Sequence, residues 1–364
     1  MKKVCILSSV HPLHDMRIFH KEAKSLANAG YSVSYIVQHD RSEDIDGIQI
    51  HALNKPKNRI ERINKVKKEL YEKALQEDAE IYHFHDPELI PVGLKLKKHG
   101  KKVIYDVHED VPRQILTKHW IPKPLRTTIS KTFEQYENRA ALRFDRVAAA
   151  TPFIEERFRK LGCNSVNINN YPILDEWLST EMDWAKKEQA VCYVGGISKV
   201  RGAFENIQAV AGKDMKLLLA GRFADQNEQI QAEQMDGWGN TEFLGYLDRE
   251  GIAETFKRSM AGLVTLHPTK NYVDALPVKM FEYMAAGLPV IASNFKILEE
   301  IVEHHQCGIC VNPLSTKEIA DAAEWIVNHP NEAQAMGENG RKAVLETFNW
   351  KQESSKLLAL YEKL

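Results

Sequence analysis

Residues 274–294 read DALPVKMFEYMAAGLPVIASN, and this stretch decides the fold. Pro277 is typical of the first position of a helix and Gly287 of the position just after one, so a helix is predicted as far as Ala286. The apolar run Pro289–Ala292 follows at once and has the length and composition of a buried strand. A helix that leads directly into such a strand is typical of a parallel α/β sheet.

The N-terminus of this helix is predicted to bind an anion. The amides of Val278 and Lys279 have no partner inside the helix, and the helix dipole favours negative charge beside them. Glu282, one turn further, shares their face and can accept two hydroxyl hydrogen bonds, while Asp274 precedes the helix. Two carboxylates that bracket such amides suit a ligand built of sugar, diphosphate and ribose. The alternative is a capped helix with a solvated Glu282.

The rest of the chain alternates short Val- and Ile-rich runs with helical patterns, which predicts βαβ units and parallel sheets. The predicted strands are Lys3–Ser9, Ser32–Val37, Ile48–His51, Glu80–Phe84, Lys102–Val107, Arg146–Ala150, Ala190–Val194, Lys216–Ala220, Thr241–Leu244, Ala261–Leu266, Pro289–Ala292 and Gly308–Val311. Helices are predicted at Phe19–Ala29, Ile60–Leu75, Pro87–Lys98 and Leu125–Arg143, and again from near Phe204, Arg249, Pro277, Thr316, Asn331 and Trp350.

The pattern restarts after Tyr171, which predicts two doubly wound domains. They comprise residues 1–172 and 173–349, and we expect the C-terminal helix 350–364 to complete the first. Ligands of open α/β sheets bind beyond the carboxyl ends of the strands. Polar and glycine-rich residues follow strands in both halves, namely His11–Arg17, His85–Glu88, His108–Asp110, Gly195–Gly202, Gly221–Arg222 and His267–Lys279. We therefore expect one phosphate-binding site in a cleft between two sheets.

Composition and charge narrow the class of protein. The chain has 43% hydrophobic and 27% charged residues, and no uncharged apolar stretch approaches the ~18 residues of a membrane span. The apolar run Val4–Val10 is too short for a secretory leader, and five scattered cysteines are typical of a reducing cytoplasm.

The charge is divided unevenly along the chain. Residues 1–180 hold 30 Lys+Arg and 24 Asp+Glu, a net charge of +6. Since the whole chain has a net charge of −1, residues 181–364 carry −7. A basic front half can face an anionic partner, or the split can be chance.

Three other motifs are weaker, and two familiar ones are absent. The chain has neither the glycine fingerprint of dinucleotide-binding folds nor a P-loop, which removes support for both. Cys307 and Cys310 form a lone C-x-x-C inside an apolar run that is typical of a strand. His83-Phe-His85-Asp86 resembles metal ligands, but no further ligand follows at a familiar spacing, so we expect a strand end with one exposed histidine. Asp44-Ile-Asp46 is interpreted as turn chemistry.

Here the chain resembles the retaining family 4 glycosyltransferases of the GT-B fold. Their signature is a Glu, seven residues, a second Glu and a run like AMAxGxPVIA; this chain has Asp274, Glu282, YMAAG and PVIAS. Similar family segments are HDMRIFHKEAKSLANAG from His14, HDPEL from His85, YDVHE from Tyr105, YVGG to Arg201-Gly202, and CGICVNP from Cys307. The resemblance covers nearly the whole chain and is specific for fold and donor class, not for one sugar.

The resemblance implies roles for individual residues. Glu282 would hold the donor's ribose, Asp274 the transferred sugar, and Arg201 the diphosphate, with the amides of Val278 and Lys279 beside it. His108 would contact the donor sugar from the front domain. The remaining donor-side positions are Gly195, Gly196, Arg222, Gly245, Tyr246 and Leu247, and the acceptor-side positions are His14, Asp15, Arg17 and His85.

Three departures from the family pattern qualify these roles. Gly196 stands where the family often has a phosphate-binding arginine, so Lys279, Lys199 or Arg222 would have to compensate. His14-Asp15 replaces a frequent Gly-Gly. Asp274 is one methylene shorter than the usual Glu.

The function predicted is transfer of a sugar from a UDP- or GDP-sugar to an envelope polysaccharide, glycolipid or similar acceptor, with retention and without metal. No cofactor is expected beyond this co-substrate, and no nucleic acid partner. The alternatives are a nucleotide-sugar 2-epimerase of GT-B-like fold and a non-catalytic nucleotide-sugar-binding protein.

The expected location is the cytoplasm, with a possible peripheral contact to the inner face of the membrane. The segment 59–75 has an apolar face surrounded by basic residues, and His119–Leu125 adds an aromatic stretch. Such a pattern favours binding to anionic lipid. The alternative is that the apolar face packs on the sheet. That face comprises Ile60, Ile63, Val66, Leu70 and Ala74.

Overall fold

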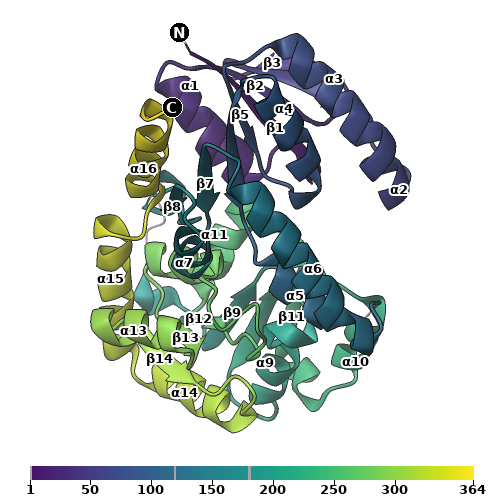
Figure 1. Cartoon of the computed structure of the whole chain (residues 1–364). Coiled ribbons are helices and arrows are strands. Elements are labelled where there is room, and N and C mark those ends of the chain that lie inside the picture. The colour runs from purple at the N-terminus through teal and green to yellow at the C-terminus, as the bar shows by residue number, and fades with distance from the viewer. Residues whose placement is uncertain (1, 119, 179–181) are drawn as a thin grey trace. The chain divides into compact units, whose positions relative to one another are not determined.

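The computed structural model describes residues 2–118, 120–178 and 182–364 and divides the chain into two compact units (Figure 1). Unit 1 is formed by the residues up to Asn170 together with Trp350–Leu364, and unit 2 by Tyr171–Asn349. The first boundary lies two residues from the one expected from the sequence. Each unit has its own parallel sheet and its own apolar core.

The sheet of unit 1 has eight strands in the order β3-β4-β2-β1-β5-β6-β7-β8, and all neighbours are parallel except β3 and β4. The strands are β1 (Lys3–Pro12), β2 (Ser32–Gln38), β3 (Glu43–Ile45), β4 (Ile48–Leu53), β5 (Ile81–Phe84), β6 (Lys102–Val107), β7 (Arg146–Ala149) and β8 (Ser165–Asn167). The helices are η1 (Met16–Ala23), α1 (Lys24–Asn28), α2 (Arg59–Glu61), η2 (Arg62–Val66), α3 (Lys67–Glu77), η3 (Pro87–Leu89), α4 (Ile90–Lys98), α5 (Val111–Thr117), α6 (Lys123–Ala141), α7 (Pro152–Lys160) and α16 (Trp350–Glu362).

The C-terminal helix α16 packs on unit 1, as Figure 1 shows by its place beside α1. Trp350 Nε1 donates to Ser25 Oγ at 2.9 Å, and the buried Glu353 accepts from the amide of Asn169 at 2.8 Å. Near the end of the helix, Tyr361 is fully buried and its hydroxyl lies 2.8 Å from Nδ1 of His83 on β5. The last helix therefore supplies both apolar and polar contacts to a sheet built from the first half of the chain.

Unit 2 has six parallel strands in the order β11-β10-β9-β12-β13-β14. They are β9 (Ala190–Val194), β10 (Lys216–Ala220), β11 (Thr241–Gly245), β12 (Ala261–Val264), β13 (Val290–Ser293) and β14 (Gly308–Val311). The helices are α8 (Asp175–Leu178), η4 (Trp184–Lys186), η5 (Lys199–Arg201), α9 (Ala203–Ala209), α10 (Gln226–Glu233), η6 (Asp236–Asn240), α11 (Arg249–Arg258), α12 (Val278–Ala285), α13 (Lys296–His305), α14 (Thr316–Asn328) and α15 (Pro330–Glu346).

The predicted strands are all present, but several features were not foreseen, among them β8, α5, α10 and α13. The strand β1 continues to Pro12, and a hairpin adds β3 to the edge of the sheet. The hairpin turns at Asp46-Gly47, where both residues have positive φ, as two-residue Asp-Gly turns require. Thr151 caps the unpredicted helix α7 by accepting from the amide of Ile154, with Pro152 in its first turn.

Most of the apolar face of the segment 59–75, which forms α2, η2 and most of α3, packs on the sheet rather than facing solvent. Val66, Leu70 and Ala74 are at most 3% exposed and belong to the core of unit 1, whereas Ile60 is 73% exposed. The membrane interpretation of this helix is therefore wrong for most of its apolar face, because the sheet already covers it. His119 and the side chains of Arg59 and Ile63 lie outside the described part of the chain.

Candidate functional site

Helix α12 forms as predicted from its flanking residues. Pro277 is its N-cap residue in extended conformation, and Gly287 follows its C-terminus at φ 80°. One side of the helix is buried through Met280, Phe281 and neighbouring residues, which anchors it against the sheet of unit 2. The N-terminal amides of the helix thus have a fixed position at the carboxyl edge of the sheet, where α/β proteins bind ligands.

Lys279 places an unpaired ammonium group beside this helix terminus. Its Nζ is buried and has neither a hydrogen-bond partner nor an ion-pair partner among the described residues. It lies 3.4 Å from the ring centroid of Tyr193, at the end of β9. Burial, reinforced by the charge of Arg201, lowers the pKa of Lys279 well below its usual range. A buried cation without a counter-ion favours the arrival of an anion.

Arg201 provides the second cation of this region. Its Nε donates to the hydroxyl of Tyr272 at 3.3 Å and its Nη1 to the carbonyl of Gly196 at 3.4 Å. The Tyr193 hydroxyl donates to the same carbonyl at 2.8 Å. A Cβ at Gly196 would lie 2.6 Å from Nη1 of Arg201, so the guanidinium occupies the space beside this glycine. The departure from the family pattern at Gly196 therefore coincides with the position taken by Arg201.

Glycines let the loops that follow β9 and β10 approach each other closely. A Cβ at Gly221 would lie 1.8 Å from the carbonyl oxygen of Gly195, and both residues have positive φ. Gly202 has φ 79°, and its Cβ would lie 2.0 Å from the carbonyl oxygen of Thr265. Side chains at Gly202 or Gly221 are thus excluded, and the backbone itself forms the edge of the site.

The two carboxylates on either side of the N-terminal amides of α12 have different surroundings. Glu282 accepts from Nη1 of Arg249 at 2.9 Å and is mostly buried. Asp274 is half-exposed and has no hydrogen bond or ion pair within the described part of the chain. Arg249 was not singled out from the sequence, because it begins a different helix, α11. One oxygen of Glu282 is held by an arginine, whereas Asp274 is available to a ligand.

The positions expected to border the base lie at the end of β11. Tyr246 is 69% exposed, and the guanidinium of Arg222 stacks on its ring at 4.4 Å. Gly245 has φ 66°, and Leu247 packs against the core. An exposed aromatic ring paired with a cation presents a flat surface beside the other donor-side residues, all within unit 2.

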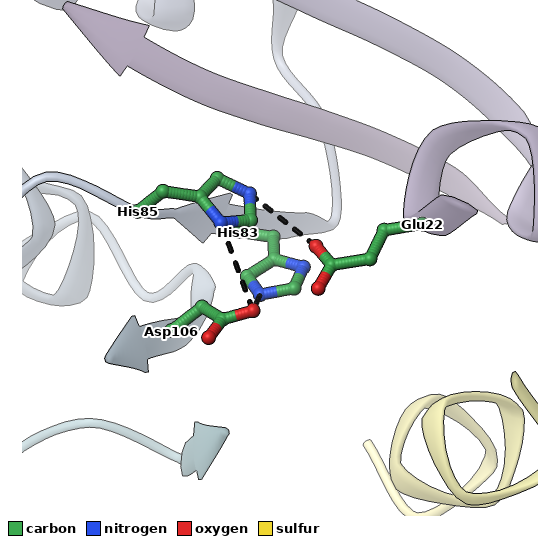
Figure 2. Close-up of side chains that lie close together, drawn as sticks. All are labelled: Glu22, His83, His85 and Asp106. Atoms are coloured by element: carbon green, nitrogen blue, oxygen red, sulfur yellow. Dashed lines mark ion pairs between the residues drawn. The ribbon is translucent and has the colours of Figure 1, made fainter. Parts of the chain in front are cut away.

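In unit 1 the structure gathers four buried side chains from three elements (Figure 2). Glu22 belongs to η1, His83 to β5, His85 follows β5 directly, and Asp106 belongs to β6. His83 and His85 are 0% and 2% exposed. The expectation of one exposed histidine at this strand end is therefore wrong: strands β1 and β6 flank β5, and the polar partners come from η1 and β6, which spacing along the chain does not reveal.

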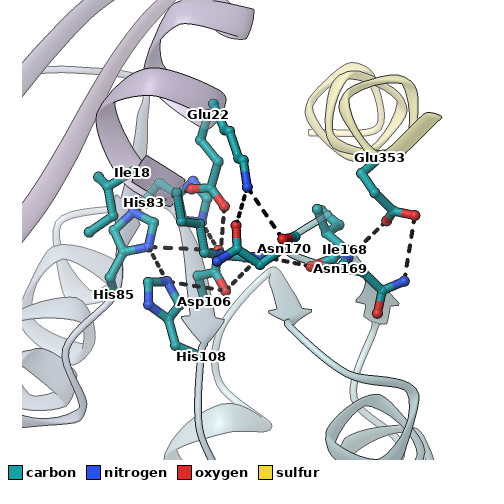
Figure 3. A network of polar contacts seen from close by, with 12 residues as sticks. Ile18, Glu22, His83, His85, Asp106, His108, Ile168, Asn169, Asn170 and Glu353 are labelled. Carbon is teal, nitrogen blue, oxygen red and sulfur yellow. Dashed lines mark hydrogen bonds and ion pairs between the residues drawn. The ribbon is translucent and has the colours of Figure 1, made fainter. Parts of the chain in front are cut away.

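Arg17 connects this cluster to the rest of unit 1. Figure 3 shows the cluster residues together with His108, Ile168 and Glu353. Its guanidinium donates to both oxygens of Asp106 at 2.9 and 3.0 Å and to the carbonyl of Ile168 at 2.8 Å, and its Nε lies 3.0 Å from Glu22 Oε1. Although burial opposes ionisation of Asp106, Arg17 holds the pKa of that carboxyl well below its usual range. Burial, together with Asp106, raises the pKa of Glu22 well above its usual range.

The predicted acceptor-side residues do not share one environment. Arg17 and His85 are buried within the cluster, at 3% and 2% exposure, so their side chains are covered by the protein. Asp15 caps η1 by accepting from the amides of Arg17 and Ile18, and it pairs with His11 at 3.1 Å. His14 is exposed. The π-helical turn of η1 was not foreseen, and such turns occur often at functional sites.

His108 lies at the surface side of the cluster. Its Nε2 is 2.9 Å from Nδ1 of His85 and 3.7 Å from Oδ1 of Asp106, and its side chain is 17% exposed. Burial lowers the pKa of His108 to about 3, so its imidazole is neutral near neutral pH. Of the histidines in this network, His108 and His11 keep some exposure, and their rings meet edge-on at 5.3 Å.

Two units, each built on a largely parallel α/β sheet, have the architecture of the GT-B fold. The family model described as "Glycosyl transferases group 1" matches residues 178–343, and the one described as "Glycosyltransferase Family 4" matches residues 17–169. The two matches together span most of both units. The chain therefore belongs to the family 4 glycosyltransferases, as its motifs predicted.

Relatives and solved structures agree with this assignment. The chain is 21% identical to MMP alpha-(1->4)-mannosyltransferase of Mycolicibacterium hassiacum over 77% of this chain and 70% of that protein. It is 22% identical to D-rhamnosyltransferase WbpZ of Pseudomonas aeruginosa over 77% and 72%. Sucrose-phosphate synthase from Thermosynechococcus elongatus has the same fold, with a TM-score of 0.77, 19% identity, and coverage of 100% and 99%.

A second solved structure with this fold is Anabaena HepE in complex with UDP. Its TM-score is 0.76 at 15% identity, with full coverage of both chains.

Within residues 2–118, 120–178 and 182–364, no helix is long and apolar enough to cross a bilayer.

Proposed function

We propose that the protein transfers a glycosyl group from a nucleoside diphosphate sugar, UDP- or GDP-linked, to a carbohydrate or lipid-linked acceptor of the cell envelope, with retention of anomeric configuration. The observation that carries the proposal is the unpaired, buried ammonium of Lys279 at the N-terminus of α12, with Arg201 as the second cation. HepE was solved with UDP and with UDP-glucose, which supports the same ligand class.

The proposed chemistry relies on electrostatic stabilisation of the leaving group. As the bond between sugar and diphosphate breaks, negative charge grows on the diphosphate, and Lys279, Arg201 and the amides of α12 stabilise it. Glu282 would hold the ribose through its second oxygen, and Asp274 the hydroxyls of the transferred sugar. His108 would contact that sugar from unit 1 as a neutral imidazole. These groups act by positioning and charge, so no covalent enzyme intermediate is proposed.

No metal ion is assigned to the transfer step, because protein cations and a helix terminus can neutralise the diphosphate. A transferase assay with and without chelator tests this point. We expect activity to survive EDTA. Loss of activity that millimolar Mg²⁺ or Mn²⁺ restores would show that the diphosphate needs a cation that the protein does not supply.

The decisive experiment is calorimetric titration with nucleotides, followed by product analysis. UDP and GDP are titrated first, and the base that binds selects the set of nucleotide sugars to be incubated with acceptors. Transfer to an acceptor supports the proposal. A new sugar formed from the donor alone would assign a 2-epimerase, and binding without any turnover would assign a nucleotide-sugar sensor.

A peripheral membrane contact is a separate proposal, now resting on fewer residues. Trp120 and Leu125 are 68% and 52% exposed, and Lys118 and Lys123 flank them. Flotation with anionic vesicles at low salt tests it, with Trp120→Ala as the variant. Absence of binding by the wild-type protein would leave this aromatic segment as ordinary surface.

A further inference from the structure

The buried cluster of Glu22, His83, His85 and Asp106 has the donor set of a metal centre. Each residue offers one ligand atom, and these four atoms lie within 4.8 Å of one another (Figure 2). All four residues are buried, at 0–2% exposure. They come from η1, from β5 and the residue following it, and from β6, so the positions are set by neighbouring strands and the turn that follows β1. Nothing in the proposed transfer reaction uses them as ligands.

Several of these atoms are without hydrogen bonds. Nε2 of His83, Nε2 of His85 and both oxygens of Glu22 are buried and have no hydrogen-bond partner among the described residues. Native proteins rarely leave buried polar atoms in this state, and an unseen ion or water is a usual reason. Three of the four residues thus bring unsatisfied atoms to the cluster, which is an observation independent of the residue types. The fourth, Asp106, accepts hydrogen bonds from Arg17, and Oε1 of Glu22 lies 3.0 Å from Nε of the same arginine.

Two separations within the cluster match those around a tetrahedral ion. His83 Nε2 lies 3.6 Å from Asp106 Oδ2, and His85 Nε2 lies 3.6 Å from Glu22 Oε2. Such distances are too long for hydrogen bonds. Ligands bound at ~2.0–2.2 Å to one tetrahedral centre are roughly 3.3–3.6 Å apart. The remaining separations are at most 4.8 Å, so an ion would have to draw the side chains inward to complete the shell.

The other atoms of the four residues are held by outer partners. Nδ1 of His83 meets the Tyr361 hydroxyl at 2.8 Å, and Nδ1 of His85 meets Nε2 of His108 at 2.9 Å. These contacts hold both rings, as outer partners do for metal-binding histidines. Nε2 of His85 faces Glu22, whereas its Nδ1 lies 3.7 Å from Oδ2 of Asp106.

Arg17 contacts the same two carboxylates that would bind the ion. Its contacts do not prevent the ion from binding them as well. Its Nε lies 3.0 Å from Oε1 of Glu22, which leaves Oε2 facing His85. It donates to both oxygens of Asp106, and a carboxylate oxygen can accept more than one contact. An arginine that bonds a ligand carboxylate is an outer partner of the same kind as Tyr361. The nearby carboxylates of Asp15 and Glu353 add negative charge around the cluster.

We propose that Glu22, His83, His85 and Asp106 bind one divalent transition-metal ion of the Zn²⁺ class as a structural centre of unit 1. Two imidazoles with two carboxylates suit Zn²⁺ better than Mg²⁺ or Ca²⁺, which prefer oxygen ligands alone. Four protein ligands leave no open position, which is the arrangement of structural rather than catalytic zinc sites. This inference does not depend on the proposed glycosyl transfer.

The first experiment measures metal in the full chain purified without a histidine tag. We expect about one Zn²⁺ per chain by elemental analysis, because four ligands complete the shell. Protein stripped of metal should take up Co²⁺ with the visible absorption of a tetrahedral complex, and zinc should raise its melting temperature. X-ray absorption of the zinc form should show nitrogen and oxygen ligands. Folded protein that takes up neither ion, or zinc bound by sulfur, would overturn the proposal and leave an ordered water as the occupant.

Variants locate the ion. Glu22→Gln keeps the size of the side chain but replaces the ligand oxygen, and we expect metal affinity to fall by more than about 100-fold. Tyr361→Phe removes only an outer partner, so a loss of roughly 10- to 100-fold is expected. His39→Asn changes a histidine outside the cluster and should leave affinity unchanged. Equal affinity in Glu22→Gln and wild type, or an equal loss in His39→Asn, would place the ion elsewhere.

Discussion

The charged groups of the two units are organised in opposite ways. In unit 1, Arg17 is buried and pairs with Asp106 and Glu22, so its charge is satisfied within the protein. In unit 2, the Nζ atom of Lys279 is buried at the helix terminus over the ring of Tyr193, and it has no hydrogen-bond partner among the described residues. A paired charge depends on its partner for stability, whereas an unpaired one costs stability until a ligand arrives. The buried charges of unit 1 therefore stabilise its fold, whereas the buried charge of unit 2 favours the binding of an anion.

The largest expected effect is on unit 1. Asp106→Asn leaves the guanidinium of Arg17 buried without its main counter-charge, so we expect a loss of about 3–5 kcal/mol in unfolding free energy. Chemical denaturation followed by circular dichroism measures it. Asp40→Asn, at an exposed position of the same unit, serves as the control and should change stability by less than about 0.5 kcal/mol. Equal effects of the two variants would show that the buried charges do not depend on each other.

The corresponding change in unit 2 should affect binding and not stability. Lys279→Met removes a cation that has no hydrogen-bond or ion-pair partner among the described residues. The unfolding free energy should therefore stay the same or rise. Affinity for UDP or GDP should fall by about 10- to 100-fold, because a charged hydrogen bond contributes ~1.5–3 kcal/mol. Lys296→Met, at an exposed lysine, is the matched control. Destabilisation by Lys279→Met without weaker nucleotide binding would contradict the contrast between the units.

The carboxylates of Glu282 and Asp274, near the N-terminus of α12, test the proposed roles within unit 2 separately. Glu282→Ala should weaken both donor and bare nucleoside diphosphate by about 10- to 100-fold, whereas Asp274→Ala should weaken only the donor and lower turnover. Arg201→Ala should weaken donor and diphosphate but spare the nucleoside. Arg249→Ala separates the loss of the Glu282 ion pair from the loss of ribose contact. Equal losses of diphosphate binding in the Glu282 and Asp274 variants would remove this division of roles.

The smallest expected effect is a pH dependence of nucleotide binding. The pKa of Lys279 is lowered by burial in the free protein, and a bound diphosphate stabilises the charged form and raises it. Binding should therefore take up protons, and affinity should fall by at most tenfold per pH unit as pH rises between the two pKa values. Calorimetry in buffers of different ionisation enthalpy measures the uptake. Lys279→Met should abolish it; uptake that persists in this variant would assign the proton to another group.

Much of the fold was predictable because its signals are local. The helix α12 and the strand β13 follow from a proline, a glycine and a run of β-branched residues that stand side by side in the sequence. The hairpin at Asp46-Gly47 and the helix after Thr151 carried equally local signals, an Asp-Gly turn and a capped Pro, and these were overlooked.

The sites were harder to predict because their contacts are not local. Glu22 and Asp106 are 84 residues apart in numbering, and only the order of strands in the sheet brings them to the same pair of histidines. Tyr193 begins the YVGG segment and Tyr272 lies between His267 and Lys279, but neither was given a role, because their contacts with Lys279 and Arg201 depend on the fold. The roles of Glu282, Asp274 and His108 stay predictions, since they depend on ligands.

The position of α16 has a consequence for synthesis of the chain. A growing chain leaves the ribosome from its N-terminus, and the partners of Glu353 and Tyr361 lie in the first half of the sequence. About 180 residues separate Asn170 from Trp350, which takes roughly 10–40 s to translate. During that interval His83 lacks the hydroxyl that meets its Nδ1, and Ser25 lacks its indole partner. Unit 1 is thus the first to begin folding and the last to finish. While unit 2 is still being synthesised, the nascent chain exposes the surface of unit 1 that α16 later covers.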